Sequence, residues 1–147
     1  MDASTTSNSS MDAVRKKIET DYQEFRKAAK NWSGVYHLFQ FGSAVLTAAA
    51  ALVLKTGLFS EVATRNDVGA ALAAFATLSI TLMTIGRFKD KWEANRIAAF
   101  AVRDLGYEIE KAGAKPDDIL TALQRIGLTR NNAIVGLTPP ASLKPSL

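Results

Sequence analysis

The chain has 147 residues, a formal net charge of +4 and an apolar content of 48%. Its length is that of one domain, which excludes a multidomain enzyme or a long repeat array. It has no cysteine and a single histidine, His37, which excludes disulfide frameworks, thiolate metal sites and His-paired metal centres. The average composition hides a segregation, because residues 31–54 and 68–86 contain no Asp, Glu, Lys or Arg. Each of these windows is close to the length needed to cross a bilayer.

The N-terminal part of the chain predicts a flexible tail followed by an amphipathic helix. Residues 1–10 are small and polar, so we expect a disordered tail. Residues 11–32 predict a helix, because their large apolar side chains recur at spacings of three and four residues: Ile18, Tyr22, Phe25, Ala29 and Trp32. This stripe can pack on another helix of the chain, on a neighbouring subunit or on the membrane surface.

Two apolar segments predict a transmembrane hairpin. The first spans about 36–54, and aromatic residues of the kind found at membrane interfaces cluster at its start. The second spans about 68–86, with Asn66-Asp67 as its predicted cap. The charges on the loop between them cancel: Lys55, Arg65, Glu61 and Asp67. Cations are concentrated before the first span and after the second, so the positive-inside rule predicts that both termini are cytoplasmic.

The rest of the chain predicts further helices on the same side of the membrane. Residues 87–112 predict a second cytoplasmic arm, so that the two-transmembrane domain covers 11–113. The segment 114–147 predicts a short helix from about Pro116 to Ile126, which Gly127 terminates, with one or two further turns after it and then a Pro-rich tail. The predicted fold class is therefore an all-α membrane protein, a two-helix transmembrane hairpin with long cytoplasmic arms in an oligomeric bundle. A soluble helical bundle is the alternative.

The sequence contains no recognisable catalytic, cofactor or metal motif, so we expect neither an enzyme nor a bound cofactor or metal. Small and hydroxyl-bearing residues form a stripe on each span, which is typical of close helix packing and also suits the lining of a water-filled pore. The pore-lining candidates are Thr77, Thr81, Thr84, Gln40 and Thr47. Because a two-helix hairpin cannot enclose a pore alone, this hypothesis requires a homo-oligomer, most simply a closed ring.

Cations and aromatic residues on the arms supply two more sets of candidates. The candidates for binding phosphate groups of lipids or of a ligand are Arg87, Lys89, Arg96 and Arg103. We expect the first two to meet anionic lipid and the last two, seven residues apart, to meet a ligand or another subunit. The candidates for packing or oligomerisation are Ile18, Tyr22, Phe25, Trp32 and Trp92. We expect His37 to be an interfacial anchor.

Four features follow one another between about residues 15 and 112. An arm with aromatic residues at its end (Phe25, Trp32, Tyr36) leads into two Ala-rich spans joined by a short loop. A basic and aromatic exit, GRFKDKWEANR (86–96), is followed by a helix with the pattern A-x-x-L-x-x-E at Ala101, Leu105 and Glu108. Ala101, Leu105 and Glu108 match that pattern loosely, since the interval between the first two is one residue longer. In this layout the chain resembles the SLATT-type two-transmembrane effector family of bacterial nucleotide-linked antiviral defence systems. The resemblance does not extend to 114–147.

The resemblance implies a multi-pass effector of the inner (cytoplasmic) membrane that oligomerises into a gated pore or ion channel. It implies that the pore disrupts the membrane in abortive infection under a nucleotide or oligonucleotide signal, with a nucleotidyltransferase as a possible partner. The alternative function is a non-conducting membrane anchor or scaffold that recruits a partner through its coiled-coil arms.

Overall fold

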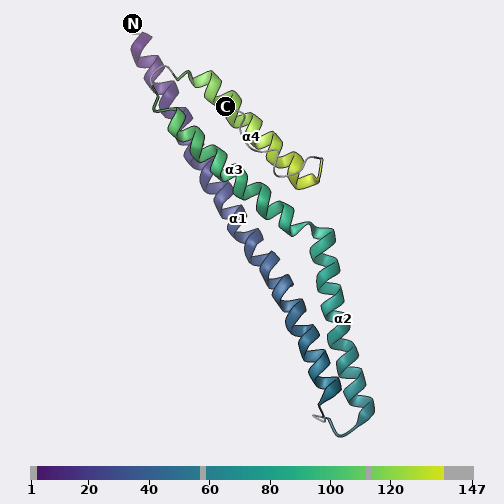
Figure 1. Ribbon diagram of the computed structural model, residues 1–147. Helices are drawn as coiled ribbons and strands as arrows, with labels where there is room; N and C mark the ends of the chain where they lie inside the picture. Colours follow the sequence, from purple (N-terminus) through teal and green to yellow (C-terminus); the bar gives the residue numbers. More distant parts are fainter. Residues whose placement is uncertain (1–2, 57–58, 112–113, 138–147) are drawn as a thin grey trace. The chain divides into compact units, whose positions relative to one another are not determined.

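The computed structural model describes residues 3–56, 59–111 and 114–137. Over these residues the chain is all-helical, as predicted, with four helices: α1 (Ala3–Lys55), α2 (Val62–Gly86), α3 (Phe88–Glu108) and α4 (Pro116–Val135) (Figure 1). Among them, α1 and α2 are long and apolar enough to cross a membrane.

The helices form two compact units. The first unit comprises Met1–Asn31 together with Asp90–Leu147, and the second comprises Trp32–Lys89. Both α1 and α3 therefore continue from one unit into the other. This division differs from the predicted one, in which 11–113 formed a single domain and 114–147 was appended to it, because α4 packs into the first unit.

α1 is one continuous helix of 53 residues, where the sequence predicts a tail, an arm and a span in succession. The predicted disorder of residues 1–10 differs from the structure, in which the helix begins at Ala3. The physical reason is cooperativity: extending an existing helix fixes one residue for each hydrogen bond gained, whereas starting a helix fixes several residues for one bond.

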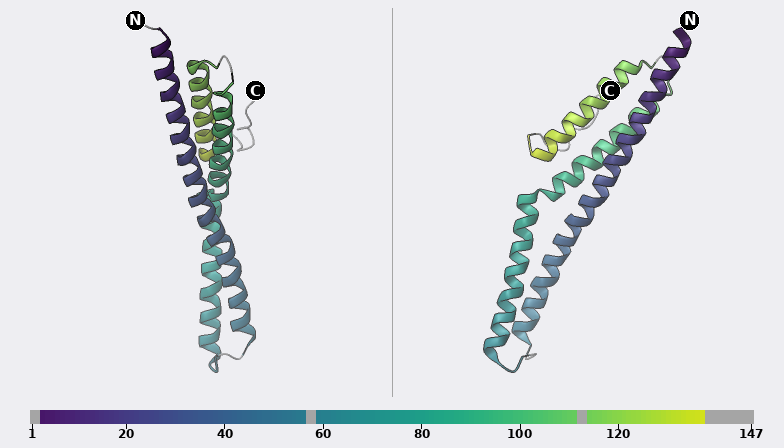
Figure 2. Two further views of the ribbon diagram at one scale, coloured as in Figure 1. Left: turned by 90° about the vertical axis from the view of Figure 1, so that its left-hand side faces the viewer. Right: turned by 180° about the vertical axis from the view of Figure 1, so that it is seen from behind.

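The first unit is a three-helix arrangement of the N-terminal part of α1, most of α3 and α4, which lie side by side in both views of Figure 2. All three helices contribute to one buried cluster, which includes Val14, Ile18 and Phe25 from α1, Ala98, Val102 and Leu105 from α3, and Ile119 and Leu123 from α4. The apolar stripe predicted for 11–32 is therefore covered by the chain itself along much of its length.

α4 is longer than the sequence predicts. It starts with Pro116 in its first turn, with Asp117 and Asp118 next to the positive end of the helix dipole, as expected. It then continues through Gly127 and ends at Gly136, whose φ is 85°. Burial of residues beyond Gly127, above all Ala133, outweighs the cost of about 1 kcal/mol that a glycine imposes inside a helix. The predicted Pro-rich tail, 138–147, lies outside the described residues.

The second unit is an antiparallel hairpin made of the C-terminal part of α1 and the whole of α2, joined through residues 56–61 (Figure 1). Its buried residues are all small, and they form the seam between the two helices: Ser43, Ala50, Gly69 and Ala76. Small residues allow two helices to approach closely. At Gly69 the approach is close, since an added Cβ would lie 2.6 Å from Cδ2 of Leu54.

α2 begins earlier than the sequence predicts. Its first residue is Val62, and the extended residue Glu61 precedes it, so Asn66-Asp67 lies inside the helix and does not cap it. The Thr64 hydroxyl donates a hydrogen bond to Oε2 of Glu61 at 2.9 Å. This contact lies at the first turn of α2, where it can stabilise the start of the helix.

Most of the apolar surface of the hairpin is not covered by the chain. Only 11% of the most apolar window of each helix is buried, whereas a core helix of a soluble protein is mostly buried. The exposed fraction reaches 71% for Leu38 and 75% for Ile85. An apolar surface this extensive is expected of helices that face lipid or other subunits.

Candidate functional site

The candidate site is the exposed surface of the hairpin. Each residue advances about 100° around a helix, so the buried seam fixes the direction of the other side chains. In α2 the exposed residues on one side of the seam are small or carry a hydroxyl: Ala70, Ala74, Thr77, Thr81 and Thr84. The other side exposes Ala71 together with four bulky apolar residues: Phe75, Leu78, Leu82 and Ile85.

The spanning part of α1 is divided in the same way. Its small or polar exposed residues are Gln40, Ala44, Thr47 and Ala51, and its bulky exposed residues are Leu38, Phe41, Val45 and Leu52. Leu54 and Ile80 lie at the border between the seam and the small residues. Ser43 is buried in the seam, where its hydroxyl donates to the Gln40 carbonyl oxygen at 2.9 Å.

The two small sets lie on the same broad side of the hairpin. In both helices the small residues are displaced from the seam in the same rotational sense. Two antiparallel helices are related by a two-fold rotation about an axis perpendicular to the plane of the hairpin, and this rotation keeps the front side in front. The hairpin therefore has a small-residue face (Gln40, Ala44, Thr47, Ala51, Ala70, Ala74, Thr77, Thr81, Thr84) and, behind it, a bulky face formed by the other two sets. All five pore-lining candidates belong to the small-residue face.

The threonines of the small-residue face present oxygen atoms as hydrogen-bond acceptors. The hydroxyl groups of Thr47, Thr77, Thr81 and Thr84 each donate to the carbonyl oxygen four residues earlier, at 2.9–3.0 Å. Their protons are thus used within the helix, while oxygen lone pairs remain available outside it. Such a face, which has no charged side chain, can hold water or a cation, or can pack against a small-residue helix of another subunit.

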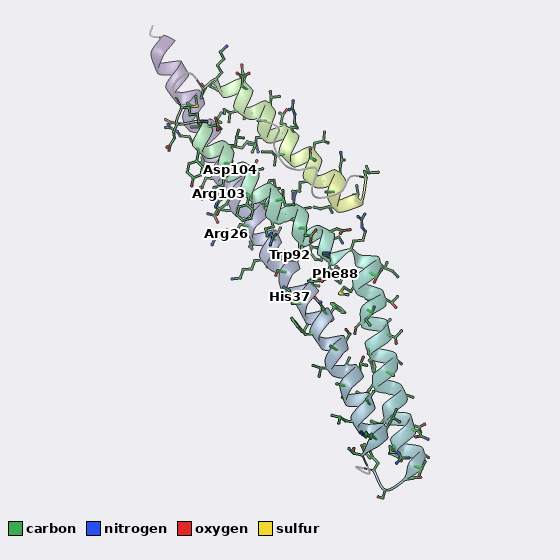
Figure 3. The ribbon with its side chains drawn as sticks, viewed as in Figure 1. Arg26, His37, Phe88, Trp92, Arg103 and Asp104 are labelled. Carbon is green, nitrogen blue, oxygen red and sulfur yellow. The ribbon has the colours of Figure 1, made fainter. Side chains whose placement is uncertain are left out.

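The four phosphate-binding candidates are divided between the two units. Arg87 and Lys89 follow α2 in the hairpin unit, whereas Arg96 and Arg103 lie two turns apart on the exposed side of α3. The Arg96 guanidinium lies 5.0 Å from the centre of the Trp92 ring, and that of Arg103 lies 5.0 Å from the centre of the Phe100 ring. Arg103 also lies 3.5 Å from Oδ1 of Asp104 (Figure 3).

The packing candidates are engaged within the chain. Ile18 and Phe25 are buried in the core of the first unit, and Tyr22 packs against that core. Trp32 stacks on Phe88, with ring centres 5.6 Å apart. The Arg96 guanidinium lies over the Trp92 ring. Their aromatic and aliphatic groups therefore stabilise the fold of one chain. His37 is exposed and contacts the rings of its neighbours Tyr36 and Phe41, at 5.2 and 5.8 Å between ring centres.

A polar contact that the sequence analysis did not predict joins the three helices of the first unit. Asn95 is fully buried; its amide donates to the Lys91 carbonyl oxygen at 2.6 Å, and its Oδ1 accepts from Nε of Arg130 at 2.8 Å. The Arg130 guanidinium lies 4.4 Å from the centre of the Phe25 ring. Burial lowers the pKa of Arg130, and the negative charge of Glu24 opposes that shift. A polar residue within the apolar side of the 87–112 arm is the signal that points to Asn95.

Within the described residues, no group of His, Asp or Glu side chains is arranged to hold a metal ion. No protein-family model, curated protein or solved structure matches the chain. The likeness to the SLATT-type family therefore stays a prediction from the sequence layout.

Proposed function

We propose that the chain is a membrane protein that assembles with copies of itself into a pore, with the small-residue face of each hairpin turned toward the pathway. The observation that supports this proposal is the division of the exposed hairpin surface into a small-residue face and a bulky face. In a bilayer, bulky apolar side chains are well solvated by lipid, whereas small and hydroxyl-bearing residues are enriched where helices meet.

The chemistry of the small-residue face favours a pathway for water and ions over a coupled transporter. Transporters and proton relays depend on ionisable groups near the middle of the membrane, and residues 31–54 and 68–86 contain no Asp, Glu, Lys or Arg. Hydroxyl oxygens can replace part of the hydration shell of an ion without trapping it. A closed ring of hairpins is the simplest assembly that turns this face to a common axis.

The biological role that we propose follows from the family resemblance. The pore would disrupt the inner membrane in antiviral, abortive-infection defence, with both termini in the cytoplasm and a nucleotide or oligonucleotide as the controlling signal. Arg96 and Arg103 on α3 are the proposed contacts for such an anion, and a nucleotidyltransferase is the proposed partner.

Charge reversal at either arginine should weaken oligonucleotide binding, and unchanged affinity would remove that residue from the site.

Cysteine accessibility tests the pore directly, because the chain has no cysteine of its own. Single-cysteine variants Gln40→Cys, Thr47→Cys, Thr77→Cys, Thr81→Cys and Thr84→Cys are reconstituted in liposomes and treated with a charged, water-soluble thiol reagent. We expect fast modification and a change of at least several-fold in ion flux. The matched controls are Val45→Cys, Leu78→Cys and Leu82→Cys on the bulky face, which should react slowly and leave the flux unchanged.

Equal reactivity on both faces would contradict the assigned lining. Absence of flux from the unmodified protein in liposomes would contradict the pore itself and favour the second candidate function, a non-conducting anchor or scaffold. That candidate is supported by the first unit, a bundle with its own core that exposes Phe100 (48%) and Tyr107 (63%) on α3. It predicts binding of a partner protein without ion flux.

A further inference from the structure

The corner between α2 and α3 has an unusual backbone. α2 ends at Gly86, α3 begins at Phe88, and Arg87 between them has a φ of 49°, the only positive φ of a non-glycine residue in the described part of the chain. The Arg87 N–H donates to the Thr84 carbonyl oxygen at 3.2 Å, which closes the last turn of α2. Left-handed backbone is disfavoured for a residue with a side chain, so the surrounding contacts must hold this corner in place.

Those contacts come from the Phe88 ring, which Figure 3 labels at the corner. The ring stacks on Trp32 with 5.6 Å between ring centres and an interplanar angle of 24°. It also lies 5.5 Å from the ring of Phe39, at an interplanar angle of 43°. Trp32 and Phe39 are seven residues apart, and thus on the same side of α1. Phe88 therefore ties the end of α2 to α1 at the open end of the hairpin, opposite the 56–61 connection.

Gly86 provides the space for this ring. A Cβ added at Gly86 would lie 2.3 Å from Cε1 and 2.6 Å from Cζ of Phe88, so the ring would have to move. By contrast, a Cβ added at Gly42 in the spanning part of α1 would meet no atom within 4 Å. An added methyl group would therefore meet the Phe88 ring at Gly86 and would meet no neighbouring atom at Gly42.

We infer that Phe88 is a positioning residue that holds α1 and α2 together at the end of the hairpin opposite the 56–61 connection. By doing so it limits ion flux through the proposed pore. This inference rests on the proposed function and adds a regulatory element to it. Phe88 is the first residue of α3, so a displacement of α3 is passed along the helix to this ring. When the ring leaves Trp32 and Phe39, α1 and α2 lose their tie at that end and can separate. Hinge residues at the ends of helices absorb such changes in many switching proteins.

The test uses a Trp92→Phe parent variant. The chain has two tryptophans, so emission from this variant comes from Trp32 alone. The ion flux of the parent variant must first equal that of the wild type. Gly86→Ala, Phe88→Ala, the double variant and the control Gly42→Ala are then compared in liposomes for ion flux and for Trp32 emission. We expect Gly86→Ala and Phe88→Ala each to raise the flux several-fold and to shift Trp32 emission to longer wavelength. The double variant should match Phe88→Ala, and Gly42→Ala should match the parent.

Phe88→Leu keeps an apolar side chain but removes the ring stacking, so it serves if Phe88→Ala lowers the helix content. It should also shift Trp32 emission and raise the flux. A parent that conducts, together with a Gly86→Ala variant equal to Gly42→Ala in both measurements, would overturn the inference and leave the proposed function standing. Additive effects of Gly86→Ala and Phe88→Ala would also overturn it. A parent without flux would overturn the proposed function, and with it the role of Phe88.

Discussion

A single buried amide connects the three helices of the first unit. Asn95 uses its amide on the backbone of α3 and its carbonyl oxygen on Arg130 of α4, while the guanidinium of Arg130 covers the Phe25 ring of α1. Truncation of Asn95 would leave Nε of Arg130 without its acceptor, and truncation of Arg130 would remove the partner of Oδ1 of Asn95 and of the Phe25 ring. Buried polar contacts of this kind fix the register of helices that apolar packing alone leaves adjustable. The sequence shows Asn95 on an apolar stripe, but its partner is 35 residues away and depends on how α4 folds back.

Asn95→Ala is expected to destabilise the first unit by about 1–3 kcal/mol, because it leaves Nε of Arg130 without its acceptor in a partly buried site. In the double variant Asn95→Ala/Arg130→Met both partners are apolar, so the loss should be smaller than the sum of the single losses. Asn131→Ala, which removes an exposed contact of Arg130 at 3.3 Å, is the control and should have little effect. Thermal unfolding followed by circular dichroism measures Asn95→Ala, Arg130→Met, the double variant and the control. Additive losses would contradict a coupled pair.

The lowered pKa of Arg130 has a defined sign for stability. The unfolded chain holds this proton more tightly than the folded chain, so stability gains from this group only as the pH rises toward the ordinary arginine pKa. The group is charged in both states at neutral pH. Its contribution is therefore constant between about pH 5 and 9.

At the scale of the helices, the sequence predicts which elements form better than where they end. The apolar periodicity identifies the spanning parts of α1 and α2, the arm of α3 and the start of α4. The ends depend on contacts made elsewhere in the fold. α4 passes Gly127 because Ala133 beyond it is buried, and α2 starts before Asn66-Asp67, at Val62, where the Thr64 hydroxyl donates to Glu61. Local cap signals cannot contain this information.

The burial of α4 gives a second stability prediction. Leu123 is 3% exposed in the shared core, whereas Leu128 on the same helix is 64% exposed. Leu123→Ala should destabilise the first unit by about 2–5 kcal/mol through lost burial and a cavity. Leu128→Ala should change stability by no more than about 0.5 kcal/mol. Urea denaturation of the full chain in detergent, followed through the helix signal, compares the two. Equal losses of stability would contradict the packing of the Leu123 side of α4 in the core of the first unit.

For the whole molecule, the sequence predicts two spans and the residues of a small stripe, but it does not say on which side of the hairpin each stripe lies. That relation depends on the seam, which consists of small residues scattered among many similar alanines. Leu54 opposite Gly69 and the burial of Ser43, Ala50 and Ala76 define the seam in the structure. Only then do Gln40 and Thr47 fall on the same face as the threonines of α2.

The orientation of the molecule in the membrane can be tested with two exposed serines. Ser60 lies in the 56–61 connection, and Ser10 lies on the N-terminal part of α1. In intact spheroplasts, a membrane-impermeant maleimide should label a Ser60→Cys variant at once and a Ser10→Cys variant only after lysis. The cysteine-free wild type is the control for background labelling. Reversed labelling would contradict the cytoplasmic placement of the termini, and labelling of both before lysis would contradict a spanning hairpin.

The short connection between α1 and α2 also bears on biosynthesis. In the proposed topology only the segment between the two spans, 55–67, must be moved across the bilayer, and its charges, Lys55, Glu61, Arg65 and Asp67, sum to zero. Two apolar helices with a small-residue seam can enter the lipid as a preformed pair. The hairpin is thus suited to be the unit of insertion, with the first unit completing its fold afterwards, when α4 has left the ribosome.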